Sequence, residues 1–403
     1  MTNASTNPLK KNLLSYLLLS LGGLFYSYQF VVRSSPNMLT DELTATFSVD
    51  ITKLGNFASY YYIAYAVSLI PLGLLMDKYR PQLLFAAGSV LCSISCFIFA
   101  YTSNFQIACF SRLLFGAGAS CGFLGTVKIG TLYLPPKHLS KVVAIAMIFG
   151  TIGGTLSQTP LEFLINTIGW RETFISLGFA GVILGALFVG FSSYSPRQDF
   201  HEFQDFDVKQ NLKTVLSSTH AWSVAIYSML MYMPIIIIGD FIGASFLERL
   251  YHIAESEAGK MITAMFIGIG VGSPCFSILS DKIQSRRLPM LLGTLLCLTS
   301  YSLIIYTNNF PIWAMYILFF TSGFFFGGKT LGYATIVEYM PPNLSGLAVG
   351  FCNTLVMGGG AIGTRLTGYL IDLRNSDSFS QNIMKSYSFD DIKFALNMIP
   401  ICI

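Results

Sequence analysis

An all-α membrane protein built from two related six-helix bundles is the fold class that this 403-residue sequence predicts. Charged residues make up only 11% of the chain and apolar residues 53%, whereas about a quarter of the residues of a soluble protein are charged. The apolar residues form continuous runs of about 20 residues, which is the length that crosses a bilayer as a helix. Barrel strands would alternate in polarity, so each run is predicted to be a helix.

Eleven full membrane-spanning helices and part of a twelfth are expected. Those of the first half are expected at residues 13–33, 54–76, 83–102, 106–131, 142–166 and 172–192. Those of the second half are expected at residues 221–247, 258–279, 289–306, 311–336 and 347–371. A twelfth begins near Phe394, and about ten residues are too few to cross a hydrocarbon core of about 30 Å. We therefore expect this last helix to be truncated at Ile403.

A polar segment divides the chain into two halves. Residues 193–219 form a linker between an N-terminal bundle (1–192) and a C-terminal bundle (220–403). Asp77-Lys78 after the second span returns as Asp281-Lys282 after the eighth, 204 positions later (281 − 77). The Tyr-Leu-Pro-Pro at 133–136 returns as Tyr-Met-Pro-Pro at 339–342, 206 positions later (341 − 135). The similar offsets indicate a duplicated six-helix unit.

Two segments carry a family resemblance. Residues 73–80 read Gly-Leu-Leu-Met-Asp-Lys-Tyr-Arg, and residues 112–118 in the fourth span read Arg-Leu-Leu-Phe-Gly-Ala-Gly. They resemble motifs of the Major Facilitator Superfamily of transporters, whose fold is two six-helix bundles related as parallel repeats. The resemblance covers nearly the whole chain. It implies that Asp77 contacts the start of the eleventh helix, near residues 345–347, when the transporter opens outward, because a carboxylate is stabilised at a helix N-terminus.

The first two spans carry a narrower resemblance. Residues 25–36 and 60–77 are rich in aromatic side chains. They are similar to the phagosomal transporters of intracellular bacteria, which take up amino acids, and to lysosomal dipeptide carriers. This resemblance implies uptake of an amino acid, a short peptide or a related nutrient.

Ionisable residues within the spans indicate functional sites, because a charge is costly in hydrocarbon. The deep cations outnumber the deep carboxylates, which favours a solute with a carboxylate or another anionic group. Substrate or coupling roles are expected for Arg112, Lys329, Tyr61, Tyr65, Gln158 and Tyr333. Gating roles are expected for Arg33, Asp240, Asp77, Lys78, Asp281, Glu162 and Arg365. Two alternatives remain: Arg112 as part of a structural ion pair, and the tyrosines at 60–62 as an interfacial aromatic belt.

The repeat also predicts a pair of opposite charges. Adding the two offsets to position 33 gives 237 and 239, so Asp240 in the seventh span lies near the position equivalent to Arg33. An aspartate in the membrane is costly without a partner. We expect the two side chains to form an outer gate, with Glu162 or Arg365 as competing partners. The alternative is two separate charges in an open vestibule.

Secondary transport by alternating access is the predicted function. The expected partners are a small carboxylate-bearing solute, such as an amino acid, a short peptide or an organic acid, and the lipid bilayer. Uptake is expected either by symport with a proton or by facilitated diffusion. A drug or metabolite exporter working by proton antiport is the alternative. An enzyme or a receptor is remote, because the sequence offers no paired metal-binding histidines, no catalytic triad and no nucleotide-binding loop. No cofactor and no nucleic acid is expected.

The basic residues near the helix ends predict the orientation. With the N-terminus inside, twelve lysines and arginines fall on the cytoplasmic side and seven on the other, and such an excess marks the cytoplasmic loops. We therefore expect a cytoplasmic N-terminus. The resemblance to transporters of intracellular bacteria implies the bacterial inner membrane, and a monomer is expected to be the working unit.

Overall fold

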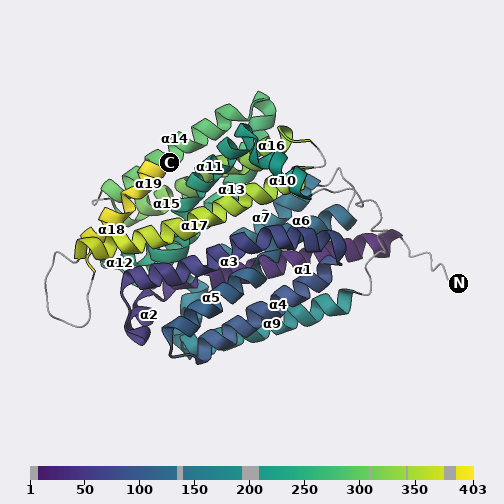
Figure 1. Ribbon diagram of the computed structural model, residues 1–403. Coiled ribbons are helices and arrows are strands. Elements are labelled where there is room, and N and C mark those ends of the chain that lie inside the picture. The colour runs from purple at the N-terminus through teal and green to yellow at the C-terminus, as the bar shows by residue number, and fades with distance from the viewer. Residues whose placement is uncertain (1–7, 134–138, 193–207, 308–309, 342–343, 376–386) are drawn as a thin grey trace.

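The computed structural model describes residues 8–133, 139–192, 208–307, 310–341, 344–375 and 387–403. They form long helices that run side by side, with no strand in these ranges (Figure 1). Within the same ranges, nine helices are long and apolar enough to cross a membrane. The prediction of an all-α membrane protein is therefore confirmed.

The helices of the first half agree with the six predicted spans, two of which are broken. They are α1 (Pro8–Ser34), η1 (Ser35–Met38), α2 (Thr40–Phe47), α3 (Ile51–Lys78), α4 (Pro81–Tyr101), α5 (Phe105–Ala119), α6 (Cys121–Tyr133), α7 (Leu139–Leu156), α8 (Thr159–Ile168) and α9 (Trp170–Ser192). The span predicted at 142–166 divides into α7 and α8 because Pro160 lies in the first turn of α8, where a proline is tolerated but cannot continue a helix.

The predicted linker is followed by the helices of the second half. Residues 193–207 lie outside the described residues, and the rest of the linker contains α10 (Val208–Leu216). The following elements are α11 (Thr219–Pro234), the π-helical η4 (Ile235–Ile242), α12 (Gly243–Tyr251), α13 (Glu255–Ile283), α14 (Arg287–Tyr306), α15 (Ile312–Phe326), η5 (Gly327–Thr330), α16 (Leu331–Glu338), α17 (Ser345–Asn375), α18 (Phe389–Leu396) and α19 (Met398–Cys402). The exact ends of the two bundles stay a prediction.

Glycines allow α13 and α15 to pack closely. A Cβ atom at Gly323 would lie 1.9 Å from the carbonyl oxygen of Met265, and one at Gly272 would lie 2.1 Å from that of Phe324. Such distances are too short for real side chains, so the backbones approach as they do in small-residue interfaces of membrane proteins. This packing holds two helices that line the space between the halves.

The two halves meet along α3 and α17 and at one end of the molecule (Figure 1). We call this the distal end: it carries α2, α12 and α18 and lies opposite the N-terminus. The Asp372 carboxylate there accepts a hydrogen bond from the Thr52 backbone N–H at 2.8 Å, and the hydroxyl of Tyr387 donates to Asp41 at 2.9 Å. These contacts close the distal end.

Candidate functional site

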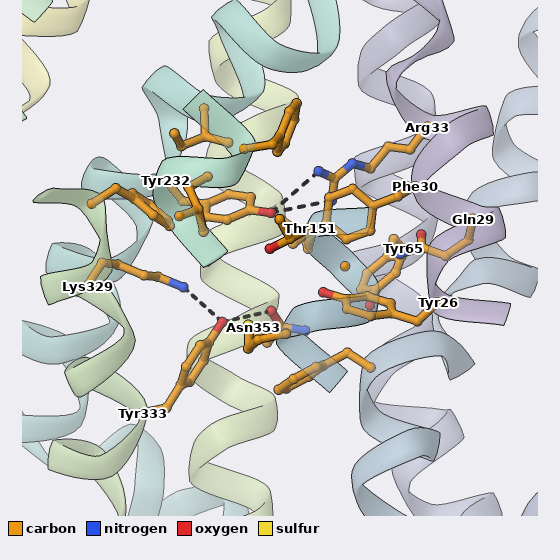
Figure 2. A pocket seen from close by; sticks show the side chains of 18 residues that line it. Tyr26, Gln29, Phe30, Arg33, Tyr65, Thr151, Tyr232, Lys329, Tyr333 and Asn353 are labelled. Atoms are coloured by element: carbon orange, nitrogen blue, oxygen red, sulfur yellow. Dashed lines mark hydrogen bonds between the residues drawn. The ribbon is translucent and has the colours of Figure 1, made fainter. Parts of the chain in front are cut away.

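A cavity of about 60 Å³ lies between the two halves. From the first half, α1, α3, α6 and α7 line it, and from the second half α11, η4, α13, α15, η5, α16 and α17. Polar side chains from both sides point into it, including Gln29, Arg33, Lys329, Tyr333 and Asn353 (Figure 2). A small solute held here would therefore contact both halves at once.

Lys329 lies where the tenth predicted span is interrupted. The short 3₁₀ segment η5 separates α15 from α16, and the Lys329 side chain enters the cavity from it. Its Nζ atom donates to the Tyr333 hydroxyl at 3.0 Å, and Tyr333 donates to Oδ1 of Asn353 at 3.2 Å. Lys329 is only 2% exposed, and it forms no salt bridge with any of the described residues.

Arg33 and Asp240 form a buried ion pair on the distal side of the cavity. Nη2 of Arg33 lies 3.0 Å from Oδ2 of Asp240, and both side chains are at most 2% exposed. The hydroxyls of Tyr62, at 2.7 Å, and of Ser34 also donate to the Asp240 carboxylate. The guanidinium lies over the Phe30 ring, with 3.7 Å between Cζ and the ring centroid. Asp240 belongs to the π-helical η4, a kind of segment that frequently occurs at functional sites.

Arg112 does not line the cavity. Its Nη1 and Nη2 atoms donate to the backbone carbonyls of Val32 and Arg33 at 2.7 and 2.9 Å. The last carbonyls of a helix have no partner within that helix, so Arg112 satisfies two of those at the end of α1. It thereby positions Arg33 through the backbone. Neither the expected substrate role nor the alternative ion pair is visible in these contacts.

The second span turns its tyrosines inward. Tyr61 and Tyr62 are buried in the molecule, so an interfacial belt does not describe these two. Tyr61 donates to Oε1 of Gln29 at 2.5 Å, and Tyr65 lines the cavity. Gln158 lies nearer the distal end, where its Nε2 atom donates to the carbonyl oxygen of Gly239 at 3.2 Å.

The remaining predicted gating residues are separate from the Arg33–Asp240 pair. Glu162 accepts a hydrogen bond from Asn166 at 3.3 Å. Arg365 donates from Nε to the Ser59 hydroxyl at 3.0 Å and thus links α17 to α3. Asp281, in the last turn of α13, pairs at 2.8 Å with Arg286, which directly precedes α14. Asp77 and Lys78 are in the last turn of α3, and their side chains lie outside the described part of the chain.

Sequence reasoning missed several polar residues of the site. Asn37 joins the halves by donating from Nδ2 to the Gly239 carbonyl at 3.2 Å and accepting from the Ala244 N–H at 3.1 Å. Tyr232 and Asn353 line the cavity. An amide within an apolar span is a signal of the kind that ionisable residues give, and it would have found Asn353. Asn37 follows Pro36 at the end of a span, where sequence alone suggests a loop.

Comparison with known proteins gives the family. A family model described as the Major Facilitator Superfamily matches residues 17–363. The chain is 21% identical over 343 residues to "Probable anion transporter 5" of Arabidopsis thaliana, with 79% of each chain covered. It is 22% identical over 399 residues to a "Probable galactarate/D-glucarate transporter" of Escherichia coli, with 88% of each covered. It is also 22% identical over 296 residues to a "Probable sulfoacetate transporter" of Cupriavidus necator, covering 67% of this chain and 66% of that one.

Solved structures show the same fold. A bacterial homologue of the human lysosomal transporter Spinster, in an inward-facing and unoccupied conformation, has a TM-score of 0.76 to this chain at 16% identity. The match covers 96% of this chain and 94% of that one. The occupied, inward-facing form of that homologue has the same TM-score at 17% identity.

Proposed function

Because the chain belongs to the Major Facilitator Superfamily, and is thus a membrane transporter of small solutes, we propose that it carries a small organic anion by alternating access. The observation that supports this proposal best is the charge of Lys329, which is buried in the cavity between the halves and has no acidic partner among the described residues. A lysine without an acidic partner is costly in a membrane protein. An anionic solute would supply that partner.

The relatives favour the organic acid among the solutes that the sequence allowed. Their printed names refer to anions, galactarate, D-glucarate and sulfoacetate. An amino acid or peptide would also bring an ammonium group, and no carboxylate is among the residues that line the cavity. We therefore place the organic acid first.

The Arg33–Asp240 pair is the proposed gate at the distal end. It joins the end of α1 to η4, so the two halves cannot separate there while the pair is intact. Separation would expose both charges to water, which lowers the cost of breaking them apart. Glu162 and Arg365 would act with this pair. Asp77, Lys78 and Asp281 lie at the far ends of α3 and α13, so they would act at the opposite side, when the distal end is open.

Direction and coupling are further parts of the proposal. We place the N-terminus in the cytoplasm of a bacterial inner membrane, so that the distal end faces outward, and we propose uptake by a monomer together with a proton. Asp240 is the proposed proton acceptor, because protonation would remove its charge and weaken the contact with Arg33.

Binding and uptake by the purified protein test the function. Organic anions that bind the folded state should raise its melting temperature, and the rise should grow with the logarithm of the ligand concentration above the Kd. In proteoliposomes with a pH gradient, uptake of the best ligand should exceed that of protein-free vesicles, and Lys329→Gln should lower its apparent affinity about tenfold or more. The exporter would instead be supported if only cations or neutral drugs stabilised the protein and if they crossed the vesicle membrane in the direction opposite to the proton flow.

A further inference from the structure

The charged side chains at the cavity leave a net charge of one positive unit. Arg33 and Lys329 are the cationic side chains among the lining residues. The carboxylate of Asp240 neutralises Arg33 at 3.0 Å. Within the described part of the chain, Lys329 forms no salt bridge. Its Nζ atom lies 3.0 Å from the Tyr333 hydroxyl and 4.2 and 5.0 Å from the ring centroids of Tyr333 and Tyr232. The closed site therefore offers one uncompensated charge, and it lies on the C-terminal half.

The wall facing that charge carries aromatic rings beside the polar side chains of Gln29, Arg33 and Thr151. Tyr26 and Phe30 of α1 line the cavity and pack edge to face, with centroids 5.1 Å apart. Phe123 of α6 lies 5.8 Å from the Tyr26 ring and 6.2 Å from the Tyr333 ring, measured between centroids. Neighbouring rings thus lead from the N-terminal half to Tyr333, the hydrogen-bond partner of Lys329. Such rings favour apolar and aromatic groups of a ligand.

The same arrangement disfavours three other kinds of anion. The first kind is a dianion, whose second negative charge would have to displace the ionised Asp240 from Arg33. The ammonium of a zwitterion would find no carboxylate among the lining residues. A sugar acid carries a hydroxyl group on each of several carbons, and the wall opposite Lys329 offers Gln29 and Thr151 as polar partners beside the rings. Hydroxyl groups left facing the rings would lose hydrogen bonds that water supplied, at a cost for each unpaired group.

We propose that the solute is an amphiphilic monoanion, with its one anionic group at Lys329, Tyr333 and Asn353 and its apolar or aromatic body against Tyr26, Phe30 and Phe123. This inference rests on the proposed function and narrows its substrate class. It separates the chain from its relatives, whose printed solutes include the hydroxylated acids galactarate and D-glucarate.

A matched ligand series tests the proposal on the purified chain. The probes are benzenesulfonate, which stays ionised and does not leak through the bilayer as a neutral acid, 3-phenylpropionate, its neutral amide, terephthalate, phenylalanine, acetate and D-glucarate. Benzenesulfonate and 3-phenylpropionate should raise the melting temperature at the lowest concentrations. The amide lacks the charge, acetate lacks the body and terephthalate carries a second charge, so each should bind about tenfold more weakly or worse.

Two variants connect the effect to the site. Lys329→Gln keeps a hydrogen-bond donor but removes the charge, so it should weaken 3-phenylpropionate about tenfold or more and leave the amide unchanged. Lys260 is exposed on α13, and Lys260→Gln is the control. It should change neither the binding of 3-phenylpropionate nor that of the amide. Uptake of labelled benzenesulfonate into proteoliposomes should show the same loss.

The outcomes separate the two proposals. If D-glucarate or terephthalate binds more tightly than 3-phenylpropionate and depends on Lys329, the amphiphilic monoanion is wrong and the anion transporter stands. If phenylalanine binds most tightly, the exclusion of zwitterions is wrong. If Lys329→Gln binds 3-phenylpropionate as well as the wild type does, the anionic group does not bind at Lys329. If no anion of the series stabilises the protein or enters vesicles, both proposals fail.

Discussion

Arg33 and Asp240 are held in place by more than their mutual Coulomb attraction. Asp240 also accepts hydrogen bonds from Ser34 and Tyr62, and Arg33 lies over Phe30. Ion pairs taken out of water are stable only when such additional partners compensate for lost hydration. The pair therefore depends on its surroundings, and an exchange of the two residues should reproduce it only in part.

Charge reversal at this pair gives the first prediction. Arg33→Asp or Asp240→Arg alone leaves two like charges buried together, and breaking a buried pair costs about 3–5 kcal/mol. Each should lower the initial rate of uptake about tenfold or more. The double variant restores a pair of opposite charges and should recover part of the rate. Recovery should be incomplete, because Ser34 and Tyr62 would no longer have a carboxylate to donate to.

The exposed pair of Lys260 and Glu257 is the control. Lys260→Ala should change the rate little, because surface pairs contribute about 0–1 kcal/mol. A double variant no faster than either single one, with all three proteins folded, would mean that these residues do not act as a pair in transport.

Arg112 gives the second prediction, which separates positioning from substrate binding. Arg112→Lys loses the two-armed contact with the carbonyls of Val32 and Arg33 and leaves one of them unsatisfied, at about 1–3 kcal/mol. The melting temperature and the maximal rate should fall, while the KM of the solute stays unchanged. A raised KM at an unchanged melting temperature would instead support the substrate role that the sequence suggested.

The sequence could predict the Arg33–Asp240 pair but not the orientation of Arg112. A repeat offset relates equivalent positions in two halves, and equivalent positions of such a pair of bundles face the same central axis. For Arg112 the sequence predicted only the span in which it lies, not the direction of its side chain. Its direction depends on the end of α1, where the α-helix changes to the 3₁₀ helix η1 with Pro36 in its first turn and the carbonyls of Val32 and Arg33 accept hydrogen bonds from Arg112.

At the level of elements, the glycine contact of α13 with α15 is the most restrictive. The third prediction is that Gly323→Ala lowers the melting temperature in detergent, because a Cβ would lie 1.9 Å from the Met265 carbonyl oxygen and overpacking costs about 1–3 kcal/mol. Gly190→Ala on α9 is the matched control, since a Cβ there meets nothing within 4 Å. Equal melting temperatures for the two variants would contradict the close packing.

Element positions were predictable because apolar length determines them, whereas their interruptions were not. The span predicted at 311–336 is broken by η5, which brings Lys329 into the cavity. The span predicted at 221–247 contains the π-helical η4 with Asp240. Both breaks lie within long spans that are apolar on average, so hydropathy alone predicts one uninterrupted helix in each place. They result from packing between helices, which a single sequence does not display.

At the level of the whole molecule, closure of the distal end is the central feature. Contacts between the halves there come from helix ends that are far apart in sequence, such as Thr159 of α8 with the Ser256 carbonyl of α13 at 3.3 Å. If transport works by alternating access, these contacts must break and re-form in each cycle. A covalent link at this position would hold the distal end closed.

A reversible cross-link across the distal end tests this account most directly. A Cβ at Gly259 would lie 3.1 Å from Oγ1 of Thr159, which brings the two positions within reach of a disulfide. In a background without the native cysteines, the Thr159→Cys, Gly259→Cys protein should lose uptake after oxidation and regain it with a reductant. Each single variant should be insensitive to both. Full uptake by the quantitatively cross-linked protein would contradict alternation at the distal end.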